Sequence, residues 1–117
     1  MSQQINNLEL EVKQNYDIVF IDTWHIYGQL IRELTKFAPL CNKWIIMHDT
    51  EIDGLYGETI RMKEDPYKKS EQSGFPIEDI IRGLMPAIEL FLKNNPEWKL
   101  KEKFTNCNGL TILERVN

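Results

Sequence analysis

Two aspartates, Asp22 and Asp49, follow short apolar runs, Asp22 directly and Asp49 after His48. The runs, residues 18–21 and 44–47, are rich in the β-branched and aromatic types that strands favour, and we expect both to be fully buried strands. Two converging carboxylates suit a hard divalent cation such as Mg²⁺, which takes oxygen ligands and keeps several waters. Such an ion would bind a substrate hydroxyl and lower its pKa.

The segment between the two runs has the period of an amphipathic helix that ends at Pro39. Its apolar face consists of Ile26, Tyr27, Leu30, Ile31, Leu34, Phe37 and Ala38. A strand, a helix and a strand make a βαβ unit with parallel strands and a right-handed crossover. Asp22 and Asp49 then lie at the carboxyl edge of the sheet, where open α/β sheets bind ligands. The alternative is that each aspartate caps the segment that follows it.

The first and the middle parts of the chain have weaker patterns. Residues 1–15 alternate weakly at Leu8, Leu10 and Val12, which indicates a short strand or an extended lead-in. Residues 51–76 carry several glycines and prolines without periodicity. A segment of this length is expected to be either a lid over the site or disordered.

The last forty residues have clear patterns again. They predict a helical turn at residues 77–82 and a main helix at residues 84–94. A half-exposed strand is expected at residues 98–104, and the Asn-Gly pair at residues 108–109 predicts an antiparallel hairpin with a last strand at residues 110–116.

Charge and composition exclude several partners. The 117 residues form one domain at most, with a net charge of -4 and a pI near 5.2, so we expect neither nucleic acid nor a membrane as a partner. No apolar run approaches the roughly 20 residues that span a bilayer. Cys41 and Cys107 lack metal-type spacing, which favours reduced thiols in a cytoplasmic protein.

Two motifs carry a family resemblance: Asp-Ile-Val-Phe-Ile-Asp-Thr-Trp-His at residues 17–25 and Ile-Ile-Met-His-Asp-Thr at residues 45–50. With the terminal hairpin they resemble the C-terminal half of a class I S-adenosylmethionine-dependent methyltransferase. The nearest group is the metal-dependent small-molecule O-methyltransferases of the cephalosporin-hydroxylase and rhamnosyl O-methyltransferase type. The resemblance, over residues 16–115, implies an α/β fold with a partial Rossmann-like sheet. In that sheet a parallel βαβ unit is followed by a helix and an antiparallel hairpin, and the N-terminal half is missing.

The resemblance also implies a role for several residues. Asp22 and Asp49 would hold Mg²⁺ or another divalent cation, with His48, or alternatively Thr50, as a weaker third ligand. His25 stands where the catechol-type relatives have a lysine that removes the hydroxyl proton, so it would be the catalytic base. The competing interpretation is that His25 only packs or forms a hydrogen bond in the first turn of the helix.

Thr23 and Trp24 would approach the adenosyl part of S-adenosylmethionine, although a tryptophan here is also an ordinary wedge between helix and sheet. The Gly-rich loop that holds this cofactor in the group has no counterpart among the six glycines of the chain. We therefore expect a fragment or truncated relative of an enzyme that methylates a small-molecule hydroxyl. The alternative is a non-catalytic α/β module that forms a homo-oligomer, or pairs with another chain, through the open edge of the first strand.

Overall fold

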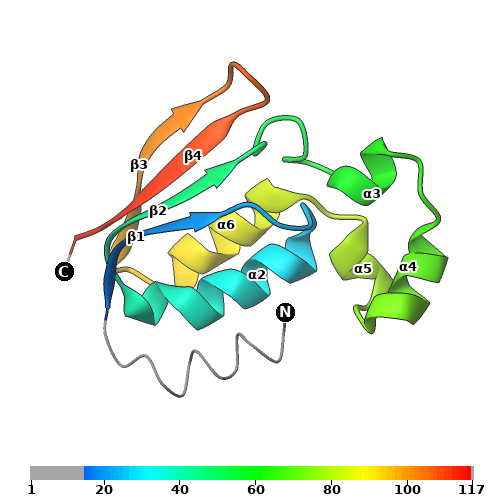
Figure 1. Ribbon diagram of the computed structural model, residues 1–117, viewed down its shortest axis with the longest axis horizontal. Helices are drawn as coiled ribbons and strands as arrows, with labels where there is room; N and C mark the ends of the chain where they lie inside the picture. The colour runs from blue at the N-terminus through cyan, green and yellow to red at the C-terminus, as the bar shows by residue number, and fades with distance from the viewer. Residues whose placement is uncertain (1–14, 117) are drawn as a thin grey trace.

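The computed structural model describes residues 15–116, which form a mixed α/β fold around a four-stranded sheet (Figure 1). The spatial order of the strands is β1 (Tyr16–Ile21), β2 (Cys41–His48), β4 (Leu110–Arg115) and β3 (Trp98–Phe104). Strands β1 and β2 are parallel, and the other two pairs are antiparallel. The parallel pair and the terminal hairpin are thus confirmed. The strand or lead-in expected around Leu8, Leu10 and Val12 lies outside the described residues.

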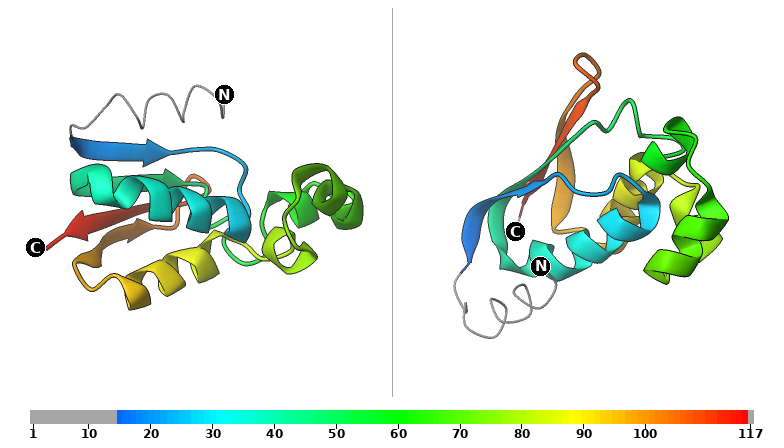
Figure 2. Two further views of the ribbon diagram at one scale, coloured as in Figure 1. Left: turned by 90° about the horizontal axis from the view of Figure 1, so that it is seen from below. Right: turned by 45° about the vertical axis from the view of Figure 1, so that its right-hand side comes forward.

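Two amphipathic helices, α2 (Tyr27–Phe37) and α6 (Leu84–Asn94), cover the same face of the sheet (Figures 1 and 2). Both helices match the sequence prediction. A 3₁₀ turn, η1 (Ala38–Leu40), takes Pro39 in its first positions and leads into β2. Pro86 lies in the first turn of α6, where the missing backbone N–H costs no helical hydrogen bond. The core between sheet and helices contains Ile21, Leu30, Leu34, Ile45, Met47, Ala87, Ile88, Phe91 and Leu113.

The prediction that both parallel strands are fully buried is wrong. In β1, the side chains of Ile18 and Phe20 are 50% and 57% exposed, and Trp44 and Ile46 of β2 are half-buried. These residues alternate with the core residues and point away from α2 and α6. The physical reason is that the described helices cover one face of the sheet, and β1 lies at its edge. We call the uncovered apolar surface the outer face; the strand register assigns to it Ile18, Phe20, Trp44, Ile46, Phe104, Leu110 and Ile112.

Residues 51–76, expected to be a lid or disordered, form a tight turn followed by α3 (Glu58–Arg61) and α4 (Pro66–Ser73). Asp65 caps α4 by accepting the backbone N–H groups of Tyr67 and Lys68, and Gly74 ends the helix in the left-handed conformation. The short helix α5 (Ile77–Ile80) then leads into α6. Figure 1 shows these three helices beyond the carboxyl ends of β1 and β2. Phe75 and Ile80 pack there on Ile26 and Trp24.

Within residues 15–116, no helix has both the length and the apolar character that a membrane span needs.

Candidate metal centre

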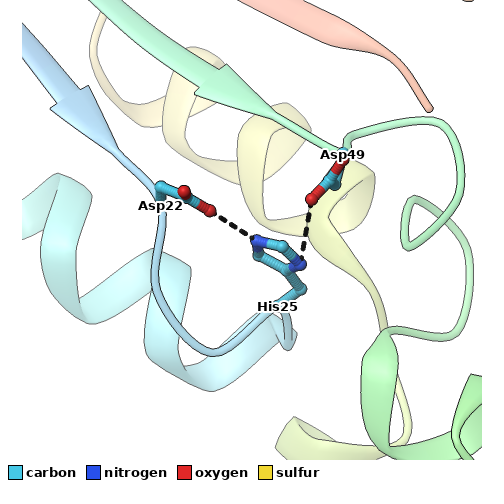
Figure 3. A group of neighbouring side chains, drawn as sticks. All are labelled: Asp22, His25 and Asp49. Carbon is cyan, nitrogen blue, oxygen red and sulfur yellow. Dashed lines mark hydrogen bonds and ion pairs between the residues drawn. The ribbon is translucent and has the colours of Figure 1, made fainter. Parts of the chain in front are cut away.

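The two aspartates meet at the carboxyl edge of the parallel pair. Asp22 follows β1 directly and Asp49 follows β2, and the last paired residues of the two strands are Ile21 and Met47. Figure 3 shows that His25 lies between the two carboxylates. Asp22, His25 and Asp49 each offer one ligand atom, and these atoms lie within 4.8 Å of one another. The predicted convergence is confirmed, whereas a role in metal binding stays a prediction.

Capping does not explain the position of Asp22. The N-cap residue of α2 is Ile26, and no side chain caps this helix. Asp49 has a φ of 61°, a left-handed conformation that aspartate tolerates better than most residues, and its N–H donates to the carbonyl of Gly109 at 2.8 Å. The hairpin turn therefore holds the backbone of Asp49 in place.

His25 lies in the loop between β1 and α2, and both of its ring nitrogens have carboxylate partners. Nε2 is 3.2 Å from Asp22 Oδ1, and Nδ1 is 2.8 Å from Asp53 Oδ2. Its backbone N–H donates to Glu58 Oε1 at 2.7 Å, and Glu58 N–H donates back to the His25 carbonyl at 2.9 Å. The side chain is only 13% exposed. His25 is thus fixed from both sides, by the sheet edge and by α3.

His48, the last residue of β2, contacts Asp22 and Asp49 from the side of the outer face. Its Nε2 is 2.7 Å from Asp22 Oδ2 and its Nδ1 is 3.2 Å from Asp49 Oδ2, while its ring lies 5.4 Å from that of Phe20. Asp22 therefore lies between two imidazoles, with one oxygen near each. The side chain of His48 is 31% exposed, more than that of His25.

Asp53 is, with Glu58, a residue of this cluster that sequence reasoning missed. Its side chain is fully buried and accepts hydrogen bonds from Arg61 Nε at 2.6 Å and Arg61 Nη2 at 3.2 Å. The hydrogen bond to Asp53 raises the pKa of Arg61 above its usual value, against a smaller opposing effect of desolvation. The available signal was the spacing of four residues from Asp49, because the N–H of Asp53 donates to the Asp49 carbonyl in a single helical turn.

A glycine allows the close approach of α3 to His25. Gly57 precedes α3 with a φ of 89°, and a Cβ there would lie 2.7 Å from the His25 carbonyl oxygen. A side chain at this position would therefore separate Glu58 from His25.

Thr50, the alternative third ligand, points away from the cluster. Its side chain is fully buried, and its hydroxyl accepts a hydrogen bond from Thr111 Oγ1 at 2.8 Å. The structure brings Asp22, His25, His48 and Asp49 together, and it leaves Thr50 hydrogen-bonded to Thr111 of β4.

Thr23 and Trp24, expected to approach S-adenosylmethionine, have partners within the chain. The Thr23 hydroxyl donates to the Glu33 carboxylate, with 2.7 and 2.8 Å to its two oxygens, and burial nevertheless raises the pKa of Glu33. Trp24 Nε1 donates to Thr59 Oγ1 at 3.1 Å, and its ring packs edge-on against Phe75. Trp24 also lines an open cavity of about 410 Å³, together with Glu58, Glu64, Lys69, Gln72 and Ser73.

The donor set fits a divalent cation. Carboxylate oxygens from Asp22 and Asp49 and an imidazole nitrogen from His25 lie within 4.8 Å of one another, so small side-chain movements would bring all three onto one ion. Asp53 and Glu58 bring the number of carboxylates in the cluster to four, against the one guanidinium of Arg61. This excess of negative charge favours a bound cation.

Comparison of the sequence with models of known protein families gives no match, and comparison with curated proteins gives no significant match.

Proposed function

We propose that the chain is part of an S-adenosylmethionine-dependent, divalent-metal-assisted O-methyltransferase that acts on the hydroxyl of a small molecule. The observation that carries the proposal is the convergence of Asp22, His25 and Asp49 at the carboxyl edge of a parallel strand pair. The unit β1–α2–β2, followed by α6 and the hairpin, agrees with the expectation for the C-terminal half of a Rossmann-like methyltransferase sheet.

The residues of the cluster divide the chemistry among them. A divalent cation held by Asp22 and Asp49 would bind the substrate hydroxyl and make it more acidic. The imidazoles of His25 and His48 both lie within hydrogen-bond distance of Asp22. Both are therefore close to the proposed ion, where a base would accept the proton of the bound hydroxyl. The motif resemblance gives proton acceptance to His25 and a ligand role to His48. Whether His25 accepts the proton or binds the metal, Asp53 holds its ring in one orientation.

The methyl donor needs more than this chain offers. The sequence contains no Gly-rich turn between a strand and a helix, so the backbone amides for S-adenosylmethionine would come from another chain or from another part of a longer chain. The cavity beside Trp24 adjoins the cluster through Glu58 and is a candidate for part of the cofactor or the substrate.

Methyl transfer is the direct test. The chain is incubated with radiolabelled S-adenosylmethionine at millimolar concentration, Mn²⁺ and a panel of phenols, catechols and sugars, and labelled product is measured for wild type and for Asp22→Asn. Slow transfer by wild type that is lost in Asp22→Asn supports the proposal. Transfer that is equal in both proteins contradicts the metal role, and no transfer by either contradicts catalysis by this chain without the separate source of backbone amides.

A second candidate function is a non-catalytic module that self-associates. The observation that favours it is the pair of exposed side chains Ile18 and Phe20 on β1, a strand whose outer edge has no partner among residues 15–116. Both the edge and the outer face offer surface to a second copy of the chain.

Sedimentation across a concentration series tests self-association. Phe20→Lys should shift the chain toward monomer, because it places a charge on the outer face. Tyr67→Lys is the matched control, since Tyr67 is 75% exposed on α4, away from the sheet. A monomeric wild type at high concentration, or equal effects of the two substitutions, would argue against this candidate.

A further inference from the structure

We propose that His25, rather than His48, supplies the nitrogen ligand of the metal centre, and that the centre therefore selects a transition-metal ion such as Mn²⁺ over Mg²⁺. The inference rests on the metal site of the proposed function and reverses the roles that the motif resemblance gives to the two histidines.

The first support is the position of the ligand atoms. Within the described part of the chain, the group whose ligand atoms all lie within 4.8 Å of one another consists of Asp22, His25 and Asp49, without His48. Metal bonds of about 2.0–2.2 Å place ligand atoms no more than about 4.4 Å apart, so small side-chain movements suffice for one ion to reach all three.

The second support is the partner of His25. Metal-bound histidines almost always donate their other ring N–H to a carboxylate, a carbonyl or a water, which fixes the tautomer and the ring orientation. Asp53 Oδ2 lies 2.8 Å from His25 Nδ1, is fully buried, and is itself held by Arg61. His48 has no comparable anchor, because its Nδ1 faces Asp49, which is one of the proposed ligands.

The third support is the direction of the second ring nitrogen of His25. Nδ1 is directed at Asp53, and Nε2 lies 3.2 Å from Asp22 Oδ1. Nε2 can therefore reach an ion held by Asp22 while Nδ1 keeps its contact with Asp53.

The donor type then determines the metal. Mg²⁺ prefers oxygen ligands in near-ideal octahedral geometry, whereas imidazole nitrogen suits transition-metal ions such as Fe²⁺, Ni²⁺ and Zn²⁺. Mn²⁺ has the lowest affinity of the first-row series for such a site, and it makes the most cautious comparison with Mg²⁺. A centre with His25 as a ligand should therefore bind Mn²⁺ more tightly than Mg²⁺. His48, the more exposed imidazole, is then left facing the substrate side.

Calorimetry with Mn²⁺ and with Mg²⁺ on the full chain tests the assignment. Wild type should bind Mn²⁺ at least about tenfold more tightly than Mg²⁺. His25→Gln should weaken Mn²⁺ binding by about tenfold or more, and Asp53→Asn by about 10–100-fold, as for other partners of ligating histidines. The matched control, His48→Gln, removes no proposed ligand and keeps a side chain that can donate to Asp22, so it should weaken Mn²⁺ binding less than His25→Gln does.

A second readout does not depend on the folding of the His25 variant. Mn²⁺ bound to wild type and to His48→Gln should show magnetic coupling to an imidazole ¹⁴N nucleus in pulsed electron paramagnetic resonance. Loss of this coupling in His48→Gln, a larger affinity loss in His48→Gln than in His25→Gln, or equal affinity for Mg²⁺ and Mn²⁺ would overturn this inference alone. Absence of any metal binding by wild type would overturn both this inference and the metal site of the proposed function.

Discussion

Removing the charge of Asp53 should destabilise the fold more than the loss of an exposed ion pair does. Asp53 is fully buried and accepts two hydrogen bonds from Arg61, at 2.6 and 3.2 Å, besides its contact with His25 at 2.8 Å. In Asp53→Asn the amide oxygen can accept hydrogen bonds from only some of these donors. The amide NH₂ group is itself a donor, and it would face another donor. Hydrogen bonds to charged groups contribute about 1.5–3 kcal/mol, so we expect a loss of about that size.

The companion substitution Arg61→Met should cost at least as much. It leaves the Asp53 carboxylate buried without its guanidinium, a situation that typically costs about 3–5 kcal/mol. The double variant should then lose less stability than the sum of the two single losses. A neutral side chain at position 53 leaves no buried charge that needs the guanidinium of Arg61, and without Arg61 fewer donors need the carboxylate.

Thermal unfolding followed by circular dichroism measures this cycle. For a domain of this size 1 kcal/mol corresponds to about 4 °C, so Asp53→Asn should lower the Tm by about 6–12 °C. The control is Lys69→Met, which breaks an exposed pair with Glu64 at 3.6 Å and should change stability by less than about 0.5 kcal/mol. Additive losses, or an Asp53 effect no larger than that of Lys69, would refute the anchoring role of the buried aspartate.

Three further predictions concern other parts of the chain. Burial raises the pKa of Glu33 above 4.5, so the folded chain holds this proton more tightly than the unfolded chain, and stability falls as the pH rises from 4.5 through the folded pKa. Glu33→Gln should therefore stabilise the chain at neutral pH and lose this advantage at pH below 4.5, as measured by urea unfolding. Burial also raises the pKa of the Cys41 thiol, so a thiol reagent should modify the exposed Cys107 quickly and Cys41 only on unfolding, as mass spectrometry of the labelled peptides would show. Gly109→Ala places a Cβ 2.3 Å from the backbone of the segment after β2, whereas Gly74→Ala at a similar φ meets nothing within 4 Å. The first substitution should cost at least about 1 kcal/mol more than the second in thermal melts, and equal costs would show that the close approach is relieved easily.

Local patterns were sufficient to predict the elements that carry the site. The helical period between residues 26 and 38, and the two apolar runs that end in Asp22 and Asp49, gave the parallel pair and its shared edge. The Asn-Gly pair gave the hairpin. These signals are visible because each depends on residues close together in the sequence.

Burial and long-range partners could not be predicted in the same way. A continuous apolar run such as residues 18–21 fits a strand buried on both faces, yet its actual exposure depends on which elements cover the sheet, and the sequence pattern contains no such information. Asp53 is 28 residues from His25 and lies in a segment without periodicity, so no local pattern pairs them. The histidine was therefore predicted as a candidate base without the buried carboxylate that orients it.

The measurement that tests the central claim most directly is thermal unfolding in Mn²⁺ and in Mg²⁺ against a chelator, for wild type and for Asp22→Asn. A metal that binds only the folded chain stabilises it by roughly 2.7 kcal/mol at about 100 times its dissociation constant, which raises the Tm by several degrees. Asp22→Asn removes a ligand charge but little volume at an exposed position, so the variant should fold without metal and lose most of the increase. Equal increases in both proteins, or no increase in either, would contradict a metal centre at Asp22, His25 and Asp49.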